Sequence, residues 1–305
     1  MSARFLLAAF MAGAAIANPF SNIEARKLPF GTAIFQCTEP DTIALTFDDG
    51  PYIYTADILD MFNAAGAKGT FFLNGHNWGY MTDHKSTVQR MLAEGHQIGH
   101  HTWSHPNLAD LDADEIADEM IELEDALIGV IGKFPTYMRP PFFSYTDATL
   151  QTLGELGYHV IHANIDTNDW SFQNECLIEN AVKMFEEGVS RGGSIVLAHD
   201  VHLLTAYTLV PAMLQMVKDR GLRAVTVGEC LGDPEANWYR THRDGHTPPP
   251  PPIGGPGPNG ICGGPNQYTC EMEGYPCCSQ FGYCGNTPDH CEAGCNPEFG
   301  WCSPL

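Results

Sequence analysis

Short apolar runs alternate with amphipathic segments between about residue 30 and residue 235. Apolar runs of four to eight residues that are rich in β-branched and aromatic side chains are typical of buried strands. They predict strands at 42–47, 69–75, 96–101, 136–140, 158–165, 193–199 and 223–228. Apolar positions with helical spacing predict helices between them, at 56–65, 87–94, 112–131, 147–156, 177–188 and 207–219. This alternation indicates an α/β fold with about seven parallel strands and helices outside, and it favours a barrel over a doubly wound sheet.

The pattern stops near residue 240. Residues 241–260 contain five consecutive prolines followed by Gly/Pro pairs, which can form neither a helix nor a sheet ladder. We therefore expect a barrel domain over 18–240, an extended linker over 241–260 and a small separate domain over 261–305.

The first seventeen residues have the features of a secretory signal peptide. Arg4 precedes an apolar run over 5–16, and Ala15-Ile16-Ala17 fits a cleavage site. A buried N-terminal helix is the alternative. The apolar run is too short to span a bilayer, and no later segment reaches about 20 apolar residues. We expect a secreted, extracellular protein, associated with a cell wall or free, with no membrane partner.

The cysteines are concentrated at the C-terminal end. Eight of the eleven lie in the small domain, at Cys262, Cys270, Cys277, Cys278, Cys284, Cys291, Cys295 and Cys302. In a secreted chain this density predicts a disulfide scaffold rather than a zinc site, but spacing alone leaves 105 possible pairings. Cys37 and Cys230 bracket the barrel, and we expect them to pair. Cys176 is then left over, and we expect a buried free thiol.

The formal charge is −22 at pH 7. This charge argues against nucleic acids and anionic membranes as partners, because the long-range field repels phosphates. It is compatible with a neutral substrate, and we expect a monomer.

Five polar clusters follow predicted strands: Asp48-Asp49, His101 with His105, Arg139, the segment 166–170, and His199-Asp200. The carboxyl ends of parallel strands in a barrel meet at one face, where active sites form. We therefore expect these side chains to surround one site.

Two pairs of histidines share a spacing of four residues. His96 and His100 lie within the predicted strand, where residues four apart are separated by ~13 Å and cannot share an ion. His101 begins the turn after the strand, and the chain can bring His105 alongside it. The pattern therefore predicts His101 and His105 as the ligand pair.

The aspartate pair admits two interpretations. Taken alone, Asp48-Asp49-Gly50 favours an Asx turn. With the two histidines it favours a hydrolytic metal site, in which one aspartate binds the ion and the other acts as general base. His199 would then be the opposing general acid, with Asp166 raising its pKa and orienting it.

The segments "TFDDGP", "HTWSH", "RPP", "DTNDW" and "LAH" resemble, in this order, the five motifs of NodB-homology polysaccharide deacetylases, carbohydrate esterase family 4. The resemblance covers about residues 38–230. It implies a distorted (β/α) barrel that removes acetyl groups from N-acetylglucosamine polymers with one divalent metal ion, most often Zn²⁺ and alternatively Co²⁺.

The same resemblance implies roles for individual residues. These are Asp48 as general base; Asp49, His101 and His105 as metal ligands; Arg139 positioning Asp48; Asp166 tuning the general acid His199; Asp169 in a supporting polar role; and Trp170 and Leu197 lining the slot for the acetyl methyl group. Phe142-Phe143 replaces the Tyr-Gly that often follows the two prolines. The backbone N–H at Phe142 can still assist the oxyanion, and we expect Phe142 and Tyr145 at the rim of the substrate pocket.

The segment "CCSQFGYCGNTPDHC" at 277–291 resembles the hevein-like chitin-binding domain, carbohydrate-binding module family 18. That resemblance implies the pairs Cys262–Cys278, Cys270–Cys284, Cys277–Cys291 and Cys295–Cys302. It places Ser279, Phe281, Tyr283 and His290 at the sugar-binding positions, His290 standing where the family usually has Tyr. A stapled module of another role, such as a protease inhibitor, is the alternative.

Together the two resemblances imply hydrolysis of the N-acetyl groups of chitin or chitooligosaccharides, which yields chitosan and acetate. The alternatives are the same chemistry on acetylxylan or peptidoglycan, and a non-catalytic chitin-binding lectin. Complete retention of the base, ligand and acid residues argues against the lectin.

Overall fold

The computed structural model describes residues 28–243 and, beyond them, residues 261–263, 269–270, 276–279, 282–291, 295–296, 299 and 302. The chain divides into two compact units, Met1–Arg240 and Thr241–Leu305. The expected signal peptide over 1–17, most of the expected linker and the expected sugar-binding residue Phe281 lie outside the described residues.

The first unit is built on one parallel sheet. Its strands are β1 (Ala33–Ile34), β2 (Thr42–Asp48), β3 (Thr70–Leu73), β4 (Gln97–His100), β6 (Tyr137–Met138), β7 (His159–Ile161), β8 (Ile165–Asp166), β9 (Ile195–His199) and β10 (Arg223–Ala224). The order is β1-β7-β6-β4-β3-β2-β9-β8, and β10 pairs with the first residues of β2. Every pair in this sheet is parallel. All carboxyl ends therefore meet at one edge, as the sequence predicts.

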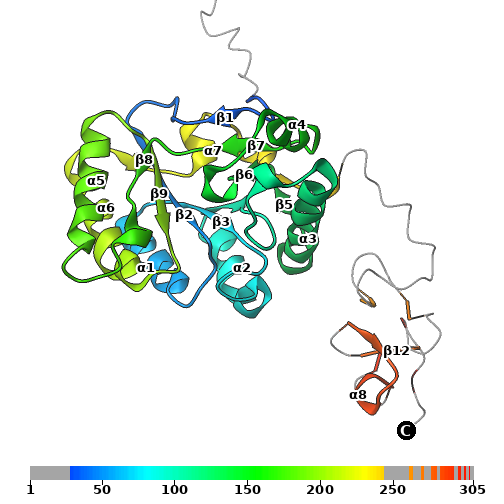
Figure 1. The fold of residues 1–305 in the computed structure, drawn as a ribbon. Coiled ribbons are helices and arrows are strands. Elements are labelled where there is room, and N and C mark those ends of the chain that lie inside the picture. The colour runs from blue at the N-terminus through cyan, green and yellow to red at the C-terminus, as the bar shows by residue number, and fades with distance from the viewer. Residues whose placement is uncertain are drawn as a thin grey trace, which may run out of the picture. The chain divides into compact units, whose positions relative to one another are not determined.

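The sheet curls into a distorted barrel (Figure 1). β7 and β8 lie near opposite ends of the strand order, yet only residues 162–164 separate them. So short a link spans at most ~14 Å, and the two ends must approach each other. Within it, the His162 N–H donates to Ile34 in β1 and the Asn164 N–H donates to Ile195 in β9. The link thus binds both edges of the curled sheet.

Helices surround the outside of the sheet (Figure 1). They are α1 (Thr55–Ala65), α2 (Lys85–Ala93), α3 (Ala113–Ile131), α4 (Asp147–Glu155), α5 (Ile178–Ser190) and α6 (Val210–Asp219), with a π-helical turn over Thr205–Leu209 before α6. The short α7 (Val227–Cys230) packs instead in a separate cluster of buried residues with Ala44 and Phe72. The capping box predicted at the start of α3 is present, because Asp112 accepts from the Glu115 backbone and Glu115 accepts from the Asp112 backbone. The apolar faces of these helices cover a core of buried aliphatic and phenylalanine side chains.

Two predicted strands differ in the structure. The run 158–165 forms β7 and β8 in different parts of the sheet, because its mixture of apolar residues with His159, His162 and Asn164 does not reveal where the chain turns. The run 223–228 forms only the short β10, after which Thr226 caps α7 through its side chain. A short antiparallel pair, β5 (Phe134–Pro135) with β11 (Tyr239–Arg240), was not predicted.

The described part of the second unit contains an antiparallel pair, β12 (Cys277–Cys278) with β13 (Cys284–Gly285), and the short α8 (Pro288–Cys291). Its disulfides fit a hevein-like module. Among the described residues, no helix combines the length and the apolar character needed to span a bilayer.

Candidate active site

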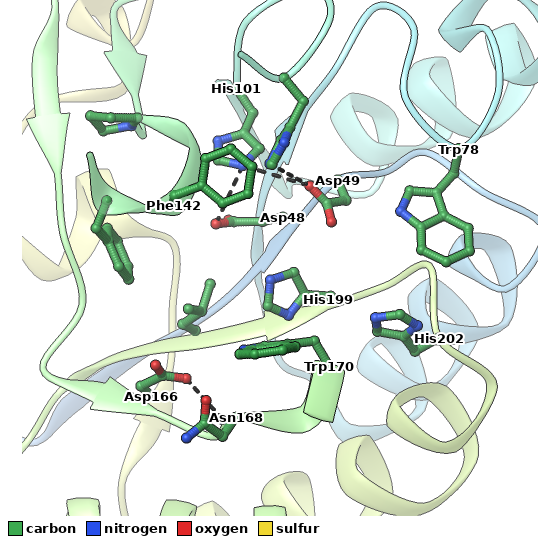
Figure 2. A pocket seen from close by; sticks show the side chains of 14 residues that line it. Asp48, Asp49, Trp78, His101, Phe142, Asp166, Asn168, Trp170, His199 and His202 are labelled. Atoms are coloured by element: carbon green, nitrogen blue, oxygen red, sulfur yellow. Dashed lines mark hydrogen bonds and ion pairs between the residues drawn. The ribbon is translucent and has the colours of Figure 1, made fainter. Parts of the chain in front are cut away.

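One pocket of about 550 Å³ opens at the carboxyl ends of the strands (Figure 2). It is lined by Asp48, Asp49, Trp78, His101, His105, Pro140, Phe142, Phe143, Asp166, Asn168, Trp170, Leu197, His199 and His202. Four of the five polar clusters contribute side chains to it directly. The fifth, Arg139, lies buried behind Asp48. The polar clusters that follow the predicted strands are therefore gathered around one pocket, as expected.

Asp48 ends β2 and is held by Arg139. The Arg139 guanidinium is fully buried, and its Nη1 donates to Asp48 Oδ1 at 2.7 Å and to Thr46 Oγ1 at 2.6 Å. The guanidinium also lies over the Phe72 ring, 4.3 Å from its centroid. A buried charge pair with this geometry fixes the direction of the carboxylate. Arg139 therefore occupies the position expected of a residue that orients Asp48.

Asp49 points to the two histidines after β4. Its Oδ1 lies 3.1 Å from His105 Nε2 and 3.7 Å from His101 Nε2. One ligand atom from each of the three residues lies within 4.8 Å of the others. Burial raises the pKa of Asp49, but the hydrogen bond with His105 and the charges of nearby histidines outweigh it and hold the pKa below its usual range. The carboxylate is therefore ionised.

The protonation state of His101 fits a cation between these residues. His101 Nδ1 lies 2.7 Å from the Arg139 carbonyl oxygen, which can only accept, so Nδ1 carries the proton. Burial lowers the pKa of His101 to about 4 and keeps the ring neutral. The Nε2 lone pair consequently faces the Asp49 carboxylate. Ligand separations of 3.1 and 3.7 Å bracket the ~3.3 Å edge of a tetrahedron with ~2.0 Å bonds. The three residues fit a divalent metal ion.

His199 faces this cluster from β9 and is paired with Asp169. Its Nδ1 donates to Asp169 Oδ1 at 2.7 Å, and its backbone N–H donates to Asp169 Oδ2 at 2.8 Å. Thr205 Oγ1 adds a third hydrogen bond to this buried carboxylate. Burial lowers the pKa of His199, but the charge and hydrogen bond of Asp169 outweigh it and raise the pKa to about 10.

The expectation that Asp166 tunes His199 is therefore wrong. Asp166 accepts from the Asn168 backbone N–H at 2.8 Å and lies apart from His199 (Figure 2). Asn168 has a left-handed backbone, with φ of 51°. This turn directs the next residue, Asp169, back toward β9. The sequence offered two aspartates three residues apart, and only the turn between them decides which one meets His199.

Three of the four residues expected to line the substrate pocket do so. Trp170 and Leu197 line the pocket, Trp170 largely exposed and Leu197 largely buried. Phe142 also lines it, and its ring contacts the His105 ring edge-on. Tyr145 does not line the pocket: its ring packs toward His162, 6.5 Å between centroids.

Two pocket residues were missed in the sequence. Trp78 follows β3 and His202 follows β9, and their rings meet edge-on with centroids 5.3 Å apart. Both follow the carboxyl ends of strands, so the rule that located the acidic and histidine clusters could have identified them. Asn77 was also missed. Its side chain donates to Asp49 Oδ1 at 3.2 Å.

Position 50, next to Asp49, requires a glycine because the Asp200 side chain packs closely against it. A Cβ added at Gly50 would lie 2.2 Å from Asp200 Oδ2, and the Asp200 carboxyl accepts from Thr55 Oγ1 at 2.5 Å. Asp200, which follows the sixth predicted strand, is thus buried behind the turn. Burial raises the pKa of Asp200 to about 7.

Left-handed backbone conformations are concentrated at the pocket. Seven described residues other than glycine have positive φ, and six of them lie at the pocket or in the turn between its two histidines: Asp49, Thr102, His105, Phe142, Phe143 and Asn168. Such conformations each cost about 1–3 kcal/mol and persist only where surrounding contacts hold them.

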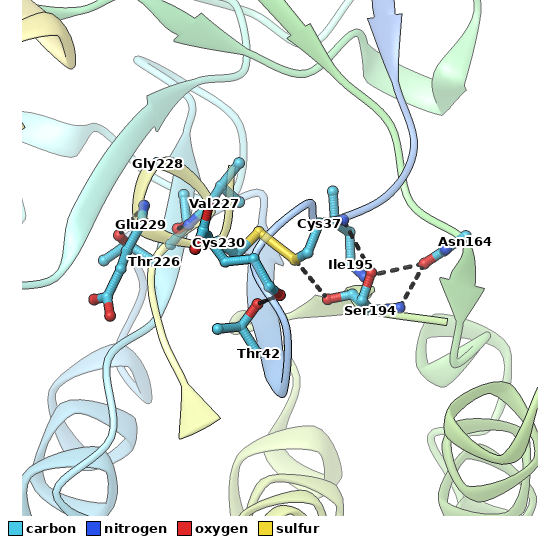
Figure 3. Close-up of a disulfide and its surroundings, with 12 residues drawn as sticks. Cys37, Thr42, Asn164, Ser194, Ile195, Thr226, Val227, Gly228, Glu229 and Cys230 are labelled. Carbon is cyan, nitrogen blue, oxygen red and sulfur yellow. Dashed lines mark hydrogen bonds between the residues drawn. A yellow bond between two sulfur atoms is a disulfide. The ribbon is translucent and has the colours of Figure 1, made fainter. Parts of the chain in front are cut away.

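The five expected disulfides are present, including Cys37–Cys230 across 193 residues (Figure 3). Around that bridge, the Cys37 N–H donates to Ser194 Oγ, while Asn164 Oδ1 accepts from the backbone of Ser194 (Figure 3). Cys176 is a free thiol, as expected, but it is exposed rather than buried. It lies in a polar loop before α5, where no apolar pattern required burial.

Three of the four expected sugar-binding residues lie among the described residues. Ser279 is buried, and its Oγ accepts from the Tyr283 N–H. Tyr283 is 52% exposed and available for contact. The ring of His290 packs on Gly285, where a Cβ would lie 2.3 Å from the ring.

Comparisons with known proteins give one family. The family description "Polysaccharide deacetylase" matches residues 35–161. A chitin deacetylase of Pestalotiopsis sp is 51% identical over 98% of this chain and 99% of the relative. A peptidoglycan-N-acetylglucosamine deacetylase of Bacillus cereus is 35% identical over 61% of this chain and 66% of the relative.

The fold agrees with this assignment. The solved structure of the chitin deacetylase from Colletotrichum lindemuthianum matches with a TM-score of 0.70 and 40% identity, over 72% of this chain and all of that one. With the curled parallel sheet and one pocket at its carboxyl edge, the chain belongs to the polysaccharide deacetylase family, carbohydrate esterase family 4.

Proposed function

We propose that the protein removes acetyl groups from N-acetylglucosamine units of chitin or chitooligosaccharides by metal-dependent hydrolysis. One observation carries the proposal. Asp48 and the Asp49–His101–His105 cluster line a single pocket with His199, which is paired with the buried Asp169. This arrangement offers a base, a cation site and an acid to one substrate amide.

We assign the metal ligands to Asp49, His101 and His105, with Zn²⁺ as the preferred ion and Co²⁺ as a possible substitute. Two neutral imidazoles and one carboxylate are the donor set of hydrolytic zinc sites. A divalent cation held there supplies Lewis acidity toward the amide carbonyl and the attacking water.

Asp48 acts as general base and takes the proton from the attacking water. Arg139 occupies one oxygen of this carboxylate, which leaves Oδ2 facing the side of His101. His199 then donates a proton to the departing amine. A pKa raised to about 10 keeps this histidine protonated at neutral pH, as a general acid requires.

Substrate placement follows from the remaining pocket residues. Trp170 and Leu197 offer apolar surface for the acetyl methyl group. Within the described part of the chain, no acceptor takes the Phe142 backbone N–H. That donor lies at the pocket rim and suits an oxyanion that develops during attack.

Chitin is the preferred substrate because a hevein-like module accompanies the barrel and close relatives are named chitin deacetylases. In the module, we assign chitin contact to Ser279, Tyr283 and His290, together with Phe281. Peptidoglycan is the second candidate, since bacterial relatives carry that name.

We further propose that the protein is secreted, with cleavage after Ala17. The five disulfides support an oxidising location. N-terminal sequencing of the protein from culture medium should begin at Asn18, and a start at Met1 would contradict the assignment.

Acetate release tests the activity. Chitin oligomers should release acetate, chelator should abolish the release, and added Zn²⁺ should restore it. Faster release from acetylxylan or peptidoglycan fragments would overturn the substrate assignment. Deleting 241–305 should reduce retention on insoluble chitin but leave kcat/KM on soluble oligomers unchanged; unchanged retention would contradict the role of the module.

A further inference from the structure

His100 is a buried histidine that faces away from the pocket. It precedes His101 at the end of β4, so the two side chains point to opposite faces of the strand. Its Nε2 lies 2.9 Å from the carbonyl oxygen of Met120 in α3, and its Nδ1 accepts from the Thr102 N–H at 3.0 Å. Because a carbonyl only accepts and an N–H only donates, these partners select the neutral tautomer with the proton on Nε2.

The hydrogen bond from the Thr102 N–H to His100 lies in a turn with a strained backbone. Thr102 has φ of 71°, and left-handed backbone is a genuine outlier for a β-branched residue. His105, three residues later, has φ of 62°. A turn with two such residues is held by its contacts rather than by intrinsic preference.

Hydrogen bonds link His100 to both pocket histidines. Thr102 Oγ1 accepts from the His105 N–H at 3.1 Å, so the orientation of Thr102 fixes the position of the His105 backbone. Asn74 supports the turn from the β3 side by donating to the carbonyls of His101 and Thr102. In this turn the His101 and His105 rings lie 5.0 Å apart between centroids, and both are directed at Asp49.

We propose that His100 is a positioning residue of the metal site. Its Nδ1 anchors the Thr102 N–H, which fixes the turn that brings His101 and His105 to Asp49. This inference rests on the metal ligands assigned under the proposed function.

Two substitutions separate the two nitrogens of His100. In His100→Asn the amide oxygen can take the place of Nδ1 and still accept from Thr102. In His100→Gln the amide reaches the place of Nε2 and can still donate to Met120, but the acceptor for Thr102 is lost. The measurement is the Zn²⁺ dissociation constant of the full-length protein, by competition with a chromophoric chelator, with thermal unfolding of the metal-free proteins alongside.

We expect His100→Gln to weaken Zn²⁺ binding by about 10- to 100-fold and His100→Asn by about 3-fold or less. Equal losses in the two variants, or no loss in His100→Gln, would overturn the proposal. His96→Gln is a matched control, because His96 is also buried and immediately precedes the same strand, but it accepts from the Gly69 N–H at the end of the strand away from the ligands. It should lower thermal stability and leave the Zn²⁺ dissociation constant unchanged; weakened Zn²⁺ binding there would assign the effect to the strand in general.

Thr102→Ala keeps the test decisive if His100→Gln does not fold. It removes the Oγ1 acceptor for the His105 N–H, the next link, and should weaken Zn²⁺ binding to a similar degree. Unchanged binding in Thr102→Ala would contradict the proposal. If the wild-type protein itself binds no Zn²⁺, the assigned metal site fails instead, and the two failures are distinguished.

Discussion

Two buried histidines face the same pocket in opposite protonation states. His101 donates through Nδ1 to a backbone carbonyl, and burial lowers its pKa to about 4. His199 donates through Nδ1 to the Asp169 carboxylate, which outweighs burial and raises its pKa to about 10. Both rings are largely buried, so the partner on Nδ1 decides the difference. In the proposed mechanism, the histidine with the neutral partner binds the metal ion, and the histidine with the ionised partner is the general acid.

Under the proposed function, this contrast separates the pocket into two sides. On one side, the Asp49 carboxylate and the His101 and His105 imidazoles form a site that fits a cation. On the other side, an imidazolium held by a carboxylate can supply a proton. In the proposed mechanism, the same residue type therefore serves as ligand or as acid according to one hydrogen-bond partner, which is how pKa tuning assigns acid and base roles in general.

The largest expected effect is on the cation side. Asp48→Asn should lower kcat by about 10⁴-fold, since the amide cannot take a proton from water, while bound Zn²⁺ is retained. His105→Ala should lose both activity and the metal. Metal content and acetate release from the two purified variants check this. Loss of Zn²⁺ in Asp48→Asn would mean that the two aspartates have been given the wrong roles.

A somewhat smaller effect is expected on the acid side. His199→Gln should lower kcat by about 10²- to 10³-fold through loss of the proton donor, with the Zn²⁺ dissociation constant unchanged. Competition with a chromophoric chelator measures that constant. If Zn²⁺ binding weakens as much as in His105→Ala, His199 is a ligand and the division of the pocket is wrong.

Asp169→Asn should make His199 resemble His101, a buried histidine whose ring is neutral. Without the carboxylate, burial acts unopposed and the pKa of His199 falls, so the protonated form is lost at lower pH. The alkaline limb of the pH–kcat profile should move to lower pH, and kcat at pH 7 should fall about 10- to 100-fold. Asp166→Asn is the control, and its alkaline limb should stay in place. A shift in Asp166→Asn of equal size would restore the role expected from the motif.

The smallest expected effect is on stability. A histidine whose pKa is raised on folding stabilises the protein fully below its ordinary pKa near 6.5, and this stabilisation is lost as the pH rises toward about 10. The free energy of unfolding of metal-free wild type should therefore decline between these pH values, by at most ~1.4 kcal/mol per pH unit from this one group. Asp169→Asn should lack this part of the decline in urea unfolding. Identical slopes in the two proteins would mean that His199 is not charged by Asp169.

Much of the fold was accessible from the sequence. The strands at 42–47 and 193–199 are apolar because parallel strands are buried on both faces, and that pattern is local. The ligand pair was accessible for a similar reason, since strand spacing excludes His96 with His100 and the strand end favours His101 with His105. The family motifs then gave the roles of Asp48, Asp49 and Arg139 as proposals that the geometry supports.

Other features depended on where the chain turns. The sequence predicts one strand over 158–165, yet this run supplies strands to two parts of the sheet, and only closure of the barrel requires the turn at 162–164. Tyr145 and Cys176 lie in loops, whose side-chain directions are not set by any period. The sequence placed the former at the pocket rim and the latter in the core, and the structure does neither.

The sequence by itself determined which residue types gather at the carboxyl edge of the sheet, because the order of strands and motifs fixes that edge. Only the tertiary structure decided which carboxylate meets which histidine. Asp166 and Asp169 are equivalent candidates in sequence, and the left-handed turn at Asn168 directs one of them to His199. The charge of His199 thus depends on a contact between segments thirty residues apart, and a local sequence pattern does not predict such a contact.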